Sequence, residues 1–143
     1  MEREPQQEEE EGVPVDRLAF SAEQCVALVA DNHGRQLDWT VASLAELDAV
    51  CAELIAPEPL GEARMAMWWS LVACYTGEVM VRSYGGEWID AGEDSAGPAV
   101  RVLGLTAFPF NTAHRVLSGE EGKSLASSVG MIPGISRHRG LAD

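Results

Sequence analysis

The residues best able to do chemistry stand in one stretch of the chain, between positions 75 and 88. Tyr75, Glu78 and Arg82 lie three and four positions apart, so on a helix their side chains share one face. A carboxylate there can act as a general base or accept hydrogen bonds from a ligand, and an arginine can hold an anion. Together with Trp88, these three are our candidate ligand-binding residues.

The same residues also fit a purely structural role. The helix that carries them is otherwise apolar, and a partly buried carboxylate is costly unless a cation pairs with it. Arg82 would clamp Glu78 and fix the helix against the Gly85-Gly86 turn that follows. Because no histidine, nucleophile or second carboxylate stands alongside, we favour this structural interpretation.

A second motif, Gly119-Glu120-Glu121-Gly122-Lys123-Ser124, ends in the Gly-Lys-Ser of a phosphate-binding loop. That loop needs four residues between its glycines and a strand before it, whereas this segment has two residues and follows a predicted helix. Its two glutamates would repel phosphate. The segment therefore predicts a turn that leads into a helix.

Histidines and cysteines give no sign of a metal centre or of nucleophilic catalysis. Each histidine stands alone, with no second ligand at metal-binding spacing. The cysteines are widely spaced on apolar helical faces, where a free thiol behaves as a small hydrophobe. We expect no catalytic residue, no metal site and no cofactor. The residues concerned are His33, His114, His138, Cys25, Cys51 and Cys74.

Three helices should form the first half of the domain. A capping box at Ser21 and Gln24 predicts the start of the first helix, and Gly34 its end. After a short extended entry at residues 37–39, Thr40 or Ser43 caps the second, and Pro57 stops it. The third runs from about residue 61 to 82 or 84 and is apolar on most sides, which is typical of a buried central helix.

The second half should supply a hairpin and two short helices. Residues 87–89 and 98–105 read as two strands, joined by an acidic loop. Pro109 fits the first turn of a helix that reaches 117 or 118. A last helix is expected from 123 to about 129, followed by a loop. The fold class is therefore α+β: four to five helices packed on a small antiparallel sheet, with the hairpin near 84–105.

Composition indicates one acidic domain. The chain has 143 residues and a net charge of −13. Residues 1–15, which hold six glutamates, should form a disordered tail, and residues 16–143 a single globular domain. An acidic body repels phosphate backbones and anionic lipid headgroups. We therefore expect no nucleic-acid and no membrane partner, but a basic protein would be attracted.

The expected location is a bacterial cytoplasm. The start of the chain lacks the basic and apolar regions of a signal peptide, and no stretch is apolar enough to cross a membrane. Three unpaired cysteines suit a reducing compartment. A preference for arginine over lysine is typical of a GC-rich bacterial genome. Monomer and homodimer both stay open.

A longer string of residues resembles a family of uncharacterised bacterial domains, of actinobacterial type. Its members share a Leu-Asp-aromatic-Ser helix start and a Gly-Glu-x-x-x-Arg-x-x-Gly-Gly-x-Trp junction between helix and strand. Here these are Leu37-Asp38-Trp39-Thr40 and the stretch from Gly77 to Trp88. Thr40 replaces the serine and keeps its capping role. The resemblance spans about residues 35–128 and implies a shared fold, without an activity.

Two functions remain as hypotheses. The first is a non-enzymatic protein-binding or regulatory module, similar to the acidic immunity proteins that neutralise basic toxins. The acidic charge and the missing catalytic set favour it. The alternative is a small-molecule-binding domain or small enzyme that uses the Tyr75, Glu78, Arg82 and Trp88 neighbourhood.

Overall fold

A computed structural model describes residues 13–93 and 95–141. Helices α2 (Val15–His33), α3 (Ser43–Ile55) and α4 (Glu62–Tyr84) come first. A sheet of β1 (Glu87–Ile89), β2 (Ala99–Val102) and β3 (Leu105–Ala107) follows. Helices α5 (Pro109–Leu117), α6 (Leu125–Gly130) and α7 (Ile132–His138) close the described chain. The expected α+β class, helices on a small antiparallel sheet, is confirmed. Most of the acidic tail, residues 1–12, lies outside the described residues.

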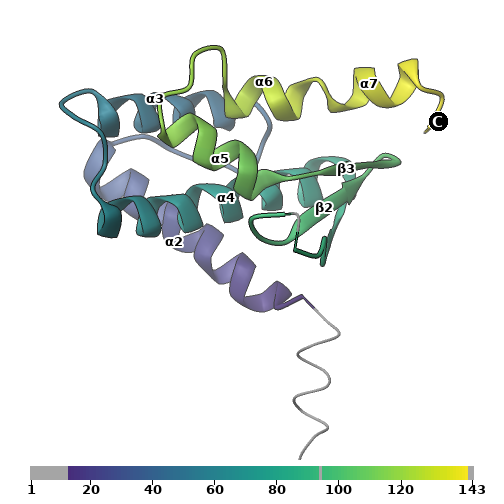
Figure 1. The fold of residues 1–143 in the computed structure, drawn as a ribbon, viewed down its shortest axis with the longest axis horizontal. Helices are drawn as coiled ribbons and strands as arrows, with labels where there is room; N and C mark the ends of the chain where they lie inside the picture. Colours follow the sequence, from purple (N-terminus) through teal and green to yellow (C-terminus); the bar gives the residue numbers. More distant parts are fainter. Residues whose placement is uncertain (1–12, 94, 142–143) are drawn as a thin grey trace, which may run out of the picture.

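Helix α4 is the centre of the domain, as its nearly all-round apolar sequence predicts. Residues 72–80 are all buried, and α2 packs along one side of the helix and α5 along another. Figure 1 shows α4 between α2 below it and α5 above it. The helix ends at Gly85, which adopts a left-handed conformation with φ 73°. The Gly85 N–H donates to the Val81 carbonyl at 3.1 Å, the bond of an αL-type helix end, and the Gly86 N–H donates to the Met80 carbonyl at 3.4 Å.

The sheet has three strands in the order β1-β2-β3, all antiparallel. We predicted one returning strand over residues 98–105, and this was wrong in detail. Leu103 and Gly104, with φ 51° and 81°, form a two-residue turn that splits the segment into β2 and β3. Two positive φ angles are what a tight hairpin turn requires. The third strand supports a hairpin that would be marginal alone.

The start of the first helix was also predicted wrongly. Helix α2 begins at Val15, so Ser21 lies inside it and caps nothing. Leu18 and Ala22 extend the buried face of the helix by one turn toward the N-terminus. The capping-box pattern at Ser21 was therefore outweighed by packing against α4. The predicted end at Gly34 is confirmed, with φ 64°.

The C-terminal segment was expected to be a loop from Gly130 and instead forms α7. Pro133 stands in the first turn of this helix, where its missing N–H costs nothing. Ile132 and Ser136 are buried, and the Ser136 hydroxyl donates to the Leu103 carbonyl at 2.7 Å. The turn between β2 and β3 therefore anchors α7, which no local sequence signal could reveal.

Candidate functional site

Glu78, Arg82 and Trp88 meet in one cluster. The Glu78 carboxylate is buried in the C-terminal third of α4. Its Oε2 accepts a hydrogen bond from the Trp88 indole Nε1 at 2.9 Å, and its Oε1 accepts one from Arg82 Nε at 3.3 Å. The predicted ion pair is present, and Trp88 is a second partner. The cluster ties the end of α4 to strand β1.

The indole of Trp88 reaches Glu78 because Gly77 leaves space for it. A Cβ atom at Gly77 would overlap the outer ring of the Trp88 indole. Any other residue at this helical position would push the ring, and its N–H, away from the carboxylate. The glycine before the glutamate is therefore part of the same arrangement, although its lack of a side chain kept it out of our list of candidates.

Tyr75 points to a different set of partners. Its hydroxyl accepts a hydrogen bond from the Trp39 backbone N–H at 2.8 Å and shares one with the Ser43 hydroxyl at 2.6 Å. Burial raises the pKa of the Tyr75 phenol, so the hydroxyl stays neutral. Tyr75 and Glu78 were expected to share one face of the helix, but they have separate hydrogen-bond partners. One intermediate residue connects Tyr75 to the cluster of Glu78 and Arg82.

That intermediate is Trp39, which we had not identified as a site residue. Its ring lies 5.0 Å from the Tyr75 ring, and the Arg82 guanidinium lies 3.8 Å above its centroid. Trp39 has φ 70°, a left-handed conformation that is rare for a bulky residue. This corrects the extended entry predicted for residues 37–39. The hydrogen bond from its N–H to Tyr75 offsets the backbone strain.

These contacts use the polar atoms of the candidate residues for hydrogen bonds within the protein. Both Glu78 oxygens and the Tyr75 hydroxyl have partners within the chain, and the Trp88 N–H is used by Glu78. Only the Arg82 side chain, 41% exposed, faces solvent to any extent. The cluster can hold α4, β1 and the loop before α3 together, and Glu78 has little room to take a proton from a substrate.

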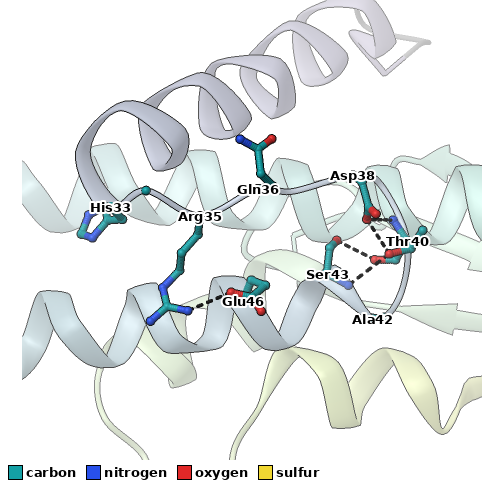
Figure 2. A pocket seen from close by; sticks show the side chains of 9 residues that line it. His33, Arg35, Gln36, Asp38, Thr40, Ala42, Ser43 and Glu46 are labelled. Atoms are coloured by element: carbon teal, nitrogen blue, oxygen red, sulfur yellow. Dashed lines mark hydrogen bonds and ion pairs between the residues drawn. The ribbon is translucent and has the colours of Figure 1, made fainter.

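A shallow pocket of about 650 Å³ lies beside this cluster, between residues 33–40 and the start of α3. Figure 2 shows Arg35 extended across α3 to Glu46, while Gln36 points to the opposite side. Arg35 also binds Glu53 at 2.8 Å, and this hydrogen bond lowers the pKa of the Glu53 carboxyl. Both terminal nitrogens of Arg35 are thus engaged by carboxylates of α3, Glu46 and Glu53.

The loop before α3 closes by short polar bonds. Thr40 Oγ1 donates to the Asp38 carboxylate at 2.6 Å and accepts from the Ser43 N–H at 3.1 Å (Figure 2). The hydrogen bond from Thr40 lowers the pKa of Asp38. We predicted Thr40 or Ser43 as the cap of α3, but Ala42 occupies the N-cap position and makes no side-chain capping bond. Thr40, two residues earlier, accepts the N–H of Ser43, the first residue of the helix, and Pro57 follows the end of the helix.

The Gly-Lys-Ser segment forms a helix start and not a phosphate loop. Ser124 caps α6 by accepting the Ser127 N–H at 3.1 Å. Asp48, on α3, accepts hydrogen bonds from the Ser124 hydroxyl and from the backbone N–H groups of Leu125 and Ala126. A carboxylate already occupies the positive end of α6, where a phosphate would have to bind.

The three thiols are buried, one on each of helices α2, α3 and α4. Burial raises the pKa of Cys51 to about 12 and that of Cys74 to about 11, and it raises the pKa of Cys25 as well. Such thiols are protonated at neutral pH and are poor nucleophiles. Among the described residues, no three His, Cys, Asp or Glu side chains gather in a way that could hold a metal ion.

Comparisons with known proteins identify no family for this chain. No protein-family model, no curated protein and no solved structure matches the chain. Within residues 13–93 and 95–141, no helix is both long and apolar enough to cross a membrane.

Proposed function

We propose that this chain is a non-enzymatic protein-binding or regulatory module, of the immunity type, whose partner carries a basic surface. The position of the carboxylates supports this proposal. Of the fifteen Asp and Glu side chains among the described residues, thirteen are exposed. The two others, Asp48 and Glu78, bind groups of the protein itself. The acidic charge therefore lies on the surface, where it can attract a partner.

The acidic surface is uneven along the chain. Residues 13–93 carry 13 acids and 4 bases, a net charge of −9. Residues 95–141 carry 2 acids and 5 bases, a net charge of +3. Helix α2 has a net charge of −2 and α3 one of −3, whereas the two acids and two arginines of α4 cancel. The loops and strand β1 of this half carry the other −4, so a basic partner would be steered toward α2, α3 and these loops.

The hydrogen bonding of the buried carboxylate and the protonation of the buried thiols support a non-enzymatic role. The buried carboxylate has two partners, and the thiols have raised pKa values. The resemblance to bacterial domains and the preference for arginine over lysine support an origin in a bacterial cytoplasm, which we also propose.

Removing surface charges tests whether the acidic surface attracts the partner. The chain is isolated gently from its own cells and examined by native mass spectrometry for a co-purifying protein, which should have a basic surface. The variant E58Q/E62Q/E87Q/E93Q removes four exposed carboxylates and should weaken that complex most strongly at low salt.

The matched control is R64Q/R101Q, which removes two exposed positive charges. It should leave the complex unchanged or make it tighter. If the partner binds all three proteins equally at every salt concentration, the acidic surface plays no part in recognition and the proposal is wrong.

The alternative function makes an opposite prediction about Glu78. If Glu78 received a small molecule, E78Q would abolish binding and leave stability unchanged. Because Glu78 joins Arg82 to Trp88, we expect E78Q to lower the free energy of unfolding by about 1–3 kcal/mol in urea titrations. A small-molecule adduct in native mass spectra that disappears in R82Q would instead favour the ligand site.

A further inference from the structure

The outer face of α2 has no covering element among the described residues. Asp16, Phe20, Glu23 and Asp31 recur at helical spacing along this face, and all four are exposed. Phe20 is 61% exposed, the largest value among the exposed apolar side chains. Figure 1 shows the N-terminal part of α2 at the lower edge of the molecule. This acidic α2 face therefore presents an aromatic side chain between carboxylates.

Helix α7 has the opposite character. No acidic residue occurs between positions 125 and 139, whereas Arg137 and Arg139 are both exposed there. Met131 is 54% exposed. A concavity of about 580 Å³ lies along the helix. We call it the basic α7 face; it is lined by Gly130, Met131, Pro133, Gly134, Ile135, Arg137, His138 and Arg139.

The two faces are complementary in charge, but they lie apart in one chain. Figure 1 shows α7 extended past the sheet at the upper right, well apart from α2 at the lower edge. An exposed aromatic ring rimmed by carboxylates is a typical anchor for a basic, apolar-lined concavity. A second copy of the chain can supply the missing half of each pair.

We propose that copies of this chain associate head to tail, with the acidic α2 face of one copy docked on the basic α7 face of the next. Phe20 enters the concavity beside Met131, and Arg137 and Arg139 face Asp16 and Glu23. The contact joins two different surfaces, so it is heterologous: a pair of copies keeps one free α2 face and one free α7 face, to which further copies can add. It depends on salt, because the paired charges lie near solvent.

Two variants test the proposal with purified protein alone, so its failure is distinct from a failure to find the basic partner proposed above. F20E breaks the acidic α2 face, and R137E/R139E breaks the basic α7 face. The replaced side chains are exposed, so the fold should persist, as circular dichroism can check. In sedimentation velocity at low salt, the parent chain should associate with rising concentration and each variant should stay monomeric.

Mixing the two variants gives the decisive result. F20E retains its α7 face and R137E/R139E retains its α2 face, so a single interface can form between them. Native mass spectrometry should show a 1:1 complex of the two variants and no larger species. High salt should dissociate it.

Matched controls carry the same changes elsewhere. M67E places a glutamate at another exposed apolar position, and R64E/R101E reverses two other exposed arginines. Both should associate like the parent chain. A parent chain that stays monomeric at every concentration and salt would overturn the proposal, as would variants that associate normally or a mixture that forms no 1:1 complex.

Discussion

Gly77 and Trp88 show how a single missing side chain shapes the site. The glycine lies in the buried stretch of α4, where alanine would be the better helix former by about 1 kcal/mol. Its presence is explained by the Trp88 ring, which fills the space where a Cβ atom would stand. Packing against the ring thus outweighs helix propensity at this position.

We therefore predict that G77A is destabilising. Displacing the Trp88 ring from Glu78 should lower the free energy of unfolding by about 1–3 kcal/mol and change the near-UV circular dichroism of tryptophan. Gly134 in α7 is the control, because a Cβ there meets nothing within 4 Å. G134A should be neutral or slightly stabilising. Equal effects of the two substitutions would contradict the packing argument.

The buried thiols predict a loss of stability in alkaline solution. In the unfolded chain Cys51 and Cys74 ionise near their ordinary pKa of 9.0, and in the folded chain near about 12 and about 11. Above pH 9.0 the unfolded state therefore loses protons that the folded state keeps. Stability is full below this pH and falls as the pH rises toward 11 and 12, by up to about 1.4 kcal/mol per thiol and pH unit.

Urea titrations at pH 8 and at about pH 10.5 measure this slope. The variant C51A/C74A removes both thiols and should show a shallower decline than the parent chain over the same interval. Ionisation of the tyrosines contributes equally to the loss of stability in the parent chain and in the variant. Parallel declines would show that thiol ionisation is not the cause.

Local spacing could predict part of the site and not the rest. The pair of Glu78 and Arg82 follows from a four-residue interval on one helix, and the structure contains it. The role of Trp39 could not be predicted this way, because its partners Tyr75 and Arg82 are 36 and 43 positions away in sequence. Its left-handed backbone is stable only once Tyr75 lies beside it.

At the level of elements, all helices but α7 were predictable, although α2 begins earlier than its capping pattern indicates. Helix α4 ends as its apolar length and the Gly85-Gly86 pair predict. Helix α7 has seven residues and contains both Pro133 and Gly134, so propensity alone argues against it. It exists because Ile132 and Ser136 are buried against the rest of the protein.

Helix α6 depends on a residue of another helix, which leads to a prediction for Asp48. This carboxylate binds the first two N–H groups of α6 and the Ser124 hydroxyl. D48A should cost about 1–2 kcal/mol, the usual value of a helix cap, and should increase amide exchange in α6. D31A, at an exposed position of α2, should change stability by less than about 0.5 kcal/mol. Unchanged exchange in D48A would contradict this role.

For the whole molecule, net charge should limit stability. A charge of −13 on 143 residues produces self-repulsion that is stronger in the compact state than in the expanded one. Added sodium chloride screens that repulsion. We predict that the urea midpoint rises between low and moderate salt at neutral pH. The R64E/R101E variant, which is more acidic by four charges, should show a larger rise, and an equal or smaller rise would refute this explanation.

The bonds of Asp48 to α6 also have a kinetic meaning. They join residues 76 to 78 positions apart, so they close a long loop that includes α4 and the sheet. Loops of that length close late, after local helices and their nearest neighbours have assembled. The capping bonds should therefore be absent from the folding transition state. Losing them in D48A should leave the refolding rate nearly unchanged and accelerate unfolding, so that Asp48 governs how long the native state lasts more than how fast it forms.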